Sequence, residues 1–201
     1  MHPYEFLQRY GPTALVAEVT DAPGEAFAAE LAKGGFDLLL PCAEPSKLET
    51  MAARFRDHEG VAVELYKDDI DAPRFAENLF PRSADQDIGL LVCGIEAGHP
   101  RMAGSLLSSL TRVFMPRLRA RRHSGVIVLD TTGKARRLGE SLASELKPEG
   151  IDVLTLCVDG QQPHLAGTLE PRALAKQAIE QMDQGPVITF APQTWTGGQT
   201  P

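Results

Sequence analysis

Several carboxylate and hydroxyl side chains follow directly after apolar runs of the sequence. Asp130 and Thr132 come after one such run, and Glu18, Glu96 and Asp159 stand in corresponding places after three others. In a parallel α/β sheet these positions lie at the carboxyl edge, where such folds bind ligands. Carboxylates there could bind a divalent cation, although the spacing matches no ligand motif. We favour solvated loop residues, because charged loop side chains usually point into water.

A thiol at the same edge offers a second kind of chemistry. Cys93 could act as a nucleophile with His99 or His164 as its base, but no motif places either histidine beside it. Cys42, Cys93 and Cys157 each end an apolar run and lack metal-ligand spacing. This pattern favours small buried side chains at strand ends in a reducing compartment, with no metal site.

The elements that would position these residues alternate along the chain. Seven apolar runs indicate strands, and the segments between them carry apolar residues at helical spacing. Such alternation predicts an α/β fold, a Rossmann-like three-layer doubly wound parallel sheet of about seven strands. The expected strands are 14–19, 36–40, 61–66, 88–93, 126–129, 151–157 and 186–190, and the expected helices are 25–33, 47–58, 73–80, 101–121, 134–147 and 171–182.

The length and the net charge of the chain indicate its domain count and exclude some kinds of function. The 201 residues favour a single Rossmann-like domain, with an N-terminal segment at 1–12 and an irregular tail at 191–201. A net charge of −7 argues against general nucleic-acid binding. No run reaches the roughly 18 apolar residues of a membrane span, and the first residues lack signal-peptide features. We therefore expect a cytoplasmic protein.

One basic cluster follows the longest expected helix. Because cations are favourable at the negative end of a helix dipole, we expect a solvated helix terminus there. The cluster consists of Arg117, Arg119, Arg121, Arg122 and His123.

Several segments within residues 10–157 carry a shared pattern: Tyr-Gly-Pro-Thr-Ala-Leu-Val at 10–16, 24–32 and Phe-Asp-Leu-Leu-Leu at 36–40. In these segments the resemblance to the short-chain dehydrogenase/reductase family is dense. It continues in 110–118 and in 138–151. Together these segments imply the fold predicted above and an ancestry among NAD(P)-dependent oxidoreductases.

The positions that would bind the cofactor in this family are altered. Family members carry glycines where a turn lets the backbone approach the dinucleotide pyrophosphate. Gly24 is retained, but Glu18 and Ala22 replace the other two glycines, and each adds a Cβ where close approach is needed. Cys93 begins the sequence in place of the family's Asn-Asn-Ala-Gly turn. Asp68 matches an adenine-contacting aspartate, but an aspartate that starts a turn explains it as well. We expect no cofactor.

The family's catalytic residues are missing too. Ala103 stands in place of the asparagine on the long helix, and Thr132 in place of the serine after the fifth strand. The Tyr-x-x-x-Lys pair is absent, and about a dozen residues of that connection are missing. Lys134 lies close to the lysine position, but it has no tyrosine whose pKa it could lower. We interpret Lys134 as a solvent-exposed residue at a helix N-terminus.

The best-preserved elements are the two helices that pair relatives into a four-helix bundle. Here they are 101–121 and 134–147, and small residues at their starts would permit close approach. Apolar residues would supply the area that a stable interface needs, although some must instead pack on their own sheet. The interface residues that we expect are Ala103, Leu106, Leu110, Phe114, Leu138 and Leu142.

Three functional hypotheses follow. The leading one is a non-catalytic structural or regulatory subunit, forming a homodimer or a hetero-oligomer with a related dehydrogenase, without nucleic acid or membrane. The second is an NAD(P)-dependent oxidoreductase with a rearranged site near Thr132 or Lys134. The third is a small-ligand sensor that uses the vacated cleft.

Overall fold

The computed structural model describes residues 2–17, 19, 22–70, 72–95, 103–130, 136–158 and 170–190. Its helices and strands alternate in the predicted order, but one additional helix precedes the first strand. The helices are α1 (Pro3–Tyr10), α2 (Ala22–Lys33), α3 (Pro45–Glu59), α4 (Phe75–Arg82), α5 (Ala103–Ala120), α6 (Arg136–Leu146), the 3₁₀ turn η1 (Lys147–Glu149) and α7 (Pro171–Gln181). The strands are β1 (Thr13–Val16), β2 (Asp37–Cys42), β3 (Val63–Lys67), β4 (Ile88–Ile95), β5 (Ser124–Asp130), β6 (Ile151–Val158) and β7 (Val187–Phe190).

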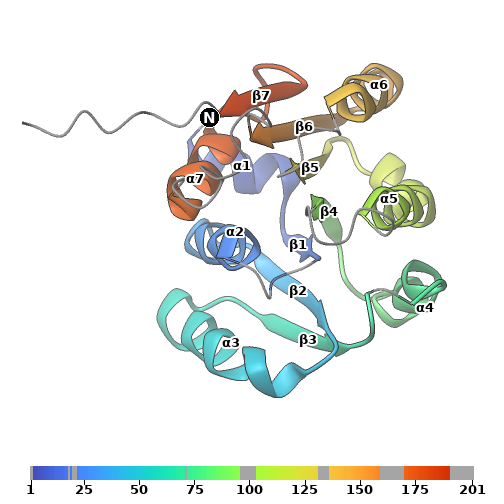
Figure 1. The fold of residues 1–201 in the computed structure, drawn as a ribbon. Coiled ribbons are helices and arrows are strands. Elements are labelled where there is room, and N and C mark those ends of the chain that lie inside the picture. Colours follow the sequence, from blue (N-terminus) through green and yellow to red (C-terminus); the bar gives the residue numbers. More distant parts are fainter. Residues whose placement is uncertain are drawn as a thin grey trace, which may run out of the picture.

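All seven strands form one parallel sheet in the order β3-β2-β1-β4-β5-β6-β7. Helices α4, α5 and α6 cover one face, while α1, α2, α3 and α7 lie on the other (Figure 1). The predicted three-layer doubly wound fold is confirmed.

The core consists of two apolar layers, one on each face of the sheet. Successive strand residues point to opposite faces, so Leu90 and Val92 join the layer under α2 and α7. Leu91 and Cys93 join the layer under α5. A sheet covered on both faces favours strands that are largely apolar, as the central strands β1 and β4 are.

Helix α1 was not predicted, because a short helix leaves only a weak periodic signal. Its local signals are nevertheless present. The ring of His2 accepts a hydrogen bond from the amide of Tyr4, and Glu5 accepts one from the amide of His2. This capping box starts the helix, and Phe6 and Tyr10 bury its apolar face.

The basic cluster is not simply a solvated helix terminus, and that prediction is wrong for Arg117 and Arg121, which are half-buried. Arg117 lies 4.0 Å from the centre of the Phe80 ring and donates to the carbonyl of Phe80 at 2.6 Å. Arg119 pairs with Glu149, and Arg121 pairs with Asp87. These arginines tie α5 to neighbouring elements. The remaining members, Arg122 and His123, are exposed and half-buried respectively.

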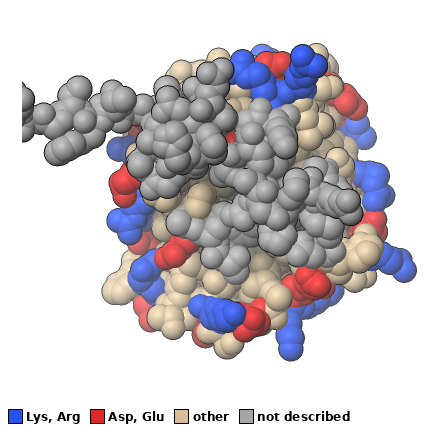
Figure 2. All heavy atoms as spheres, viewed as in Figure 1, with Lys and Arg blue, Asp and Glu red and all other residues tan. Residues whose placement is uncertain are grey.

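Within the described residues, no helix combines the length and the apolar character needed to cross a membrane. The described charges are of mixed sign around the face seen in Figure 2.

Candidate functional site at the carboxyl edge of the sheet

The candidate site is the edge at which all seven parallel strands end. Strand order reverses between β1 and β4, the switch point at which open α/β sheets bind ligands. Asp130 and Cys157 stand side by side here, since β5 and β6 pair in register at these two residues. Several predicted site residues lie outside the described residues: Glu18, Glu96, His99, Thr132, Lys134, Asp159 and His164.

Asp130 is not the solvated loop residue that we expected. It is the last residue of β5 and only 1% exposed. The thiol of Cys157 points at its carboxylate, with Sγ 3.8 Å from Oδ2. A buried carboxylate needs polar partners, and this thiol is one of them.

The electrostatics of this pair keep the thiol protonated. Burial, and then the charge of Asp130, raise the pKa of Cys157 to about 11, while the charge of Arg136 at the start of α6 opposes this. Because the thiolate is the reactive form of cysteine, Cys157 is a weak hydrogen-bond donor here and not a nucleophile.

Cys93 does not form a nucleophilic site either. It is 1% exposed and packs in the layer under α5. Its sulfur lies 3.6 Å from the carbonyl oxygen of Gly94. Cys42, the last residue of β2, is also buried, and burial raises the pKa of its thiol. The prediction of buried cysteines near strand ends is confirmed, and none of the three forms a disulfide.

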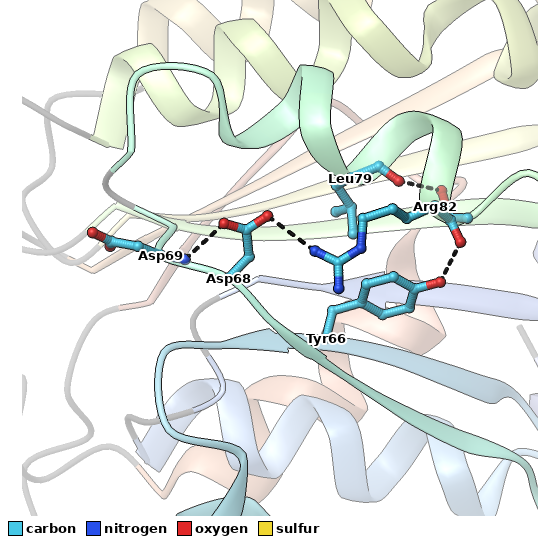
Figure 3. A network of polar contacts seen from close by, with 6 residues as sticks. Tyr66, Asp68, Asp69, Leu79 and Arg82 are labelled. Atoms are coloured by element: carbon cyan, nitrogen blue, oxygen red, sulfur yellow. Dashed lines mark hydrogen bonds and ion pairs between the residues drawn. The ribbon is translucent and has the colours of Figure 1, made fainter.

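Asp68 is held by the turn that it begins, as Figure 3 shows. Its Oδ1 accepts a 2.9 Å hydrogen bond from the amide of Asp69. Its Oδ2 lies 3.4 Å from Nη1 of Arg82, whose guanidinium stacks over the ring of Tyr66 at 4.8 Å. These contacts match those of an aspartate that starts a turn.

The start of α2, where a pyrophosphate would be expected, begins at Ala22, and Gly24 is buried in its first turn. Beside it lies an open depression of about 440 Å³ between α2 and α3. Its two cations are already paired with carboxylates, Lys47 with Glu44 at 2.8 Å and Arg54 with Glu25 at 3.6 Å. Within the described residues, no group of three or more His, Cys, Asp or Glu side chains could hold a metal.

The chain has three tyrosines, all of them described, and none lies at the carboxyl end of β5. Tyr4 is exposed on α1. Tyr10 is fully buried and donates to Asp152, the second residue of β6 at the opposite edge. Tyr66, on edge strand β3, donates to the carbonyl of Arg82. The phenol that the family pattern requires has no counterpart.

Three predicted interface residues are buried in the core of the protein. Leu106, Leu110 and Phe114 are 6%, 1% and 0% exposed and pack on the sheet beneath α5. These three side chains therefore offer a partner little surface while α5 packs on the sheet. Leu138 and Leu142 remain half-buried at the edge of that layer. Ala103 is the first residue of α5, and its side chain lies outside the described part of the chain.

The outward side of α5 carries Ser108, Arg112 and Pro116, with Val113 half-buried. Sequence periodicity identified the apolar stripe of α5 correctly, but could not tell whether it faces the sheet or a partner.

Comparisons with known proteins agree with this fold. No family model matches the chain. The chain is 27% identical over 84 residues to the 7beta-hydroxysteroid dehydrogenase of Collinsella aerofaciens, covering 42% of this chain and 32% of that protein. It is 31% identical over 99 residues to the human "Inactive hydroxysteroid dehydrogenase-like protein 1", covering 48% and 29%. The chain thus spans about a third of the length of the curated relatives it matches.

Solved structures match over nearly the whole chain. A metagenomic short-chain oxidoreductase in complex with NADP has a TM-score of 0.77 at 17% identity, covering 92% of this chain and 98% of that chain. A structure of 7beta-hydroxysteroid dehydrogenase has a TM-score of 0.72 at 20% identity, covering 92% and 88%. At these identities the likeness establishes the fold.

Proposed function

We propose that the chain is a non-catalytic member of the short-chain dehydrogenases/reductases, which it resembles in local sequence and in fold. In this proposal it acts as a structural or regulatory subunit in the cytoplasm, associating with itself or with an active relative. The observation that carries the proposal is the location of its three tyrosines. Tyr10 and Tyr66 are committed to hydrogen bonds elsewhere in the fold, and Tyr4 lies on the surface of α1.

A reductase of this family needs a proton donor beside the carbonyl that receives the hydride. General acid catalysis contributes about 10²–10⁴-fold, and the donor must lie within hydrogen-bond reach of the reacting oxygen. Cys157 is a poor substitute, because its thiol is buried and directed at Asp130. The absence of a phenol there supports loss of the family reaction.

The cofactor side supports the same proposal. Glu18 and Ala22 replace glycines at the turn that would approach a pyrophosphate. The cations Lys47 and Arg54, on α3, already have carboxylate partners. A dinucleotide would have to displace these ion pairs and approach added carboxylates, and repulsion between like charges weakens such binding.

Relatives provide a precedent for the loss of activity. Human, rat and mouse proteins among the matches carry the word "Inactive" in their names, at 31%, 33% and 33% identity. Each match covers 29% of the relative, so the precedent supports the proposal by analogy.

The association surface that fits this structure lies mainly on α6. Leu138 and Leu142 are half-buried there, and Val113 is half-buried on α5. The burial of Leu106, Leu110 and Phe114 leaves this apolar strip narrow. An interface on this strip is therefore expected to be small or transient unless residues outside the described part contribute.

Two measurements test the proposal. Turnover of ketone and alcohol substrates with NADH and NADPH is expected to stay at background, with an active 7beta-hydroxysteroid dehydrogenase as positive control. Calorimetric titration with either nucleotide is expected to show no saturable binding. Micromolar affinity for a nucleotide would contradict the proposed loss of cofactor binding. Turnover would establish the alternative, an oxidoreductase with a rearranged site.

The partner part of the proposal has its own test. Leu142→Glu should weaken self-association or co-purification with a related dehydrogenase, whereas Ser144→Glu, on the same helix, should not. Circular dichroism must show that both variants are folded. Equal association of wild type and Leu142→Glu would exclude α6 as the contact.

One observation favours a second candidate function, a small-ligand sensor. Asp130 and Cys157 form a buried polar pair at the ends of β5 and β6, at the edge where such sheets bind ligands. Because hydroxysteroid dehydrogenases recur among the relatives, a steroid-like ligand is the first class to test. A hydroxysteroid that raises the melting temperature by several degrees without nucleotide would support this candidate. Loss of that shift in Asp130→Asn would connect it to this site.

A further inference from the structure

A basic depression lies at the opposite, amino edge of the sheet. It is lined by residues of α1, of the segment before β4 and of the turn between α5 and β5, and has a volume of about 550 Å³. The depression is open to solvent, so a ligand bound there would keep part of its surface in water. The lining residues are Gln8, Arg9, Asp87, Ala120, Arg121, Arg122 and His123.

We propose that this depression binds the phosphate group of a small anionic ligand. Three guanidinium groups line it, from Arg9, Arg121 and Arg122. Asp87 in the lining and Asp152, the partner of Arg9, oppose them, which leaves one positive charge in excess among these five residues. The chain as a whole carries a net charge of −7. A local excess of positive charge in an acidic protein concentrates anions at that place.

Two of these arginines are held rigidly. Arg121 pairs with Asp87 and donates to the carbonyl of Gly11, with its Nε 3.4 Å from the carbonyl oxygen of His123. Arg9 donates from Nη2 to Asp152 at 2.8 Å and lies 5.5 Å from the centre of the Tyr10 ring. The carboxylates that hold these two guanidinium groups also offset their charge, so Arg9 and Arg121 shape the depression and Arg122 carries its unpaired charge.

Arg122 provides the donors that remain open. It is exposed and makes no ion pair with any described residue. His123 follows it and is half-buried. A guanidinium presents several N–H donors in one plane, which suits the oxygens of a phosphate better than an ammonium does. Arg122 is therefore the residue expected to contact the ligand directly.

This site is independent of the proposed loss of dehydrogenase activity. It lies at the amino edge, where α5 ends and β5 begins, whereas the family's cofactor cleft lies at the carboxyl edge. Inorganic phosphate and pyrophosphate carry no nicotinamide or adenine, so their binding would report on this site without invoking the cofactor cleft.

The test is calorimetric titration of the full chain with inorganic phosphate and with pyrophosphate in a buffer of low ionic strength, where screening is weak. Wild type should show saturable binding, tighter for pyrophosphate. Arg122→Ala should weaken it by about tenfold. The matched control is Arg137→Ala, which removes one exposed arginine from α6 and changes the net charge equally.

Two outcomes would overturn the proposal. One is the absence of saturable binding of either anion below about 10 mM. The other is equal weakening by Arg122→Ala and Arg137→Ala, which would mean that the anions respond only to net charge.

Discussion

The hydroxyl of Tyr10 donates a 2.7 Å hydrogen bond to Oδ2 of Asp152, joining residues 142 positions apart in the sequence. The same carboxylate oxygen accepts from Arg9 at 2.8 Å. Tyr10 itself is fully buried. This hydrogen bond joins α1 to the amino end of β6. One of the chain's three tyrosines therefore has a structural role.

Removing this hydroxyl should destabilise the fold. Tyr10→Phe keeps the ring but deletes the donor to Asp152, so we expect the free energy of unfolding to fall by about 1–2 kcal/mol. For a chain of this size that corresponds to roughly 2–8 °C in Tm. Tyr4→Phe is the control, because Tyr4 is 62% exposed. Equal Tm values for the two variants would contradict the assigned role of this bond.

Gly139 is required by close contact between α6 and β6. A Cβ at this position would lie 1.9 Å from Oγ1 and 2.7 Å from Cβ of Thr155. Gly139→Ala should therefore destabilise the protein by about 1–3 kcal/mol through overpacking, despite the higher helix propensity of alanine. Urea unfolding measures the loss.

Gly185→Ala is the matched control, since a Cβ there meets nothing within 4 Å. Thr155→Ala should relieve part of the loss in the Gly139→Ala background, which gives a coupling energy in a double-mutant cycle. Strict additivity would show that the two residues do not compete for space.

Stability should fall in alkaline solution. Burial raises the pKa of Cys157 from 9.0 to about 11, and burial also raises the pKa of Tyr10. Each group is neutral below its unfolded pKa, so its stabilising contribution is complete there and is lost as pH rises towards the folded pKa. For Cys157 the affected window is about pH 9 to 11.

Within that window, one such group changes stability by on the order of 1 kcal/mol per pH unit. Cys157→Ser removes the titration while keeping a donor for Asp130, so its stability should fall less steeply with pH. Chemical unfolding at several pH values checks this. The same slope in both proteins would rule out Cys157 as a contributor.

The three thiols should be unreactive in the native state. Cys42, Cys93 and Cys157 are 3%, 1% and 3% exposed, and the thiolate is the reactive form. A colorimetric thiol reagent at pH 8 should react slowly with the native protein and should detect three thiols after unfolding. Rapid modification of one native thiol would show that a cysteine site is accessible.

Arg117 should contribute more to stability than an exposed arginine on the same helix. It donates to the carbonyls of Phe80 and Ser83, both at 2.6 Å, at the end of α4. Arg117→Lys loses the planar fork and is expected to reduce the free energy of unfolding by about 1–3 kcal/mol. Arg112→Lys affects an exposed ion pair with Glu77 and should change the free energy of unfolding by less than about 1 kcal/mol.

Much of the fold was predictable because its signals are local. Apolar runs identified all seven strands. Helix α1 was missed since only its capping residues and the pair Phe6 and Tyr10 mark it.

The candidate site was harder to predict, because burial decides the chemistry of its residues. From sequence, Asp130 was a loop carboxylate and Arg117 a solvated cation. In the fold, Asp130 is 1% exposed beside a thiol, and Arg117 packs on Phe80. Neighbours on other strands or helices determine these environments, and they are distant in the sequence.

The sequence by itself determined which residues are available: an alternating α/β pattern, only three tyrosines and no glycine at positions 18 and 22. The tertiary structure alone decided where those residues act. Each helix has an apolar stripe, but only packing shows that Leu106, Leu110 and Phe114 face the sheet. Likewise, Tyr10 meets Asp152 only because α1 folds against the amino end of β6. Periodicity is a property of one segment, whereas burial and contact depend on how several segments meet.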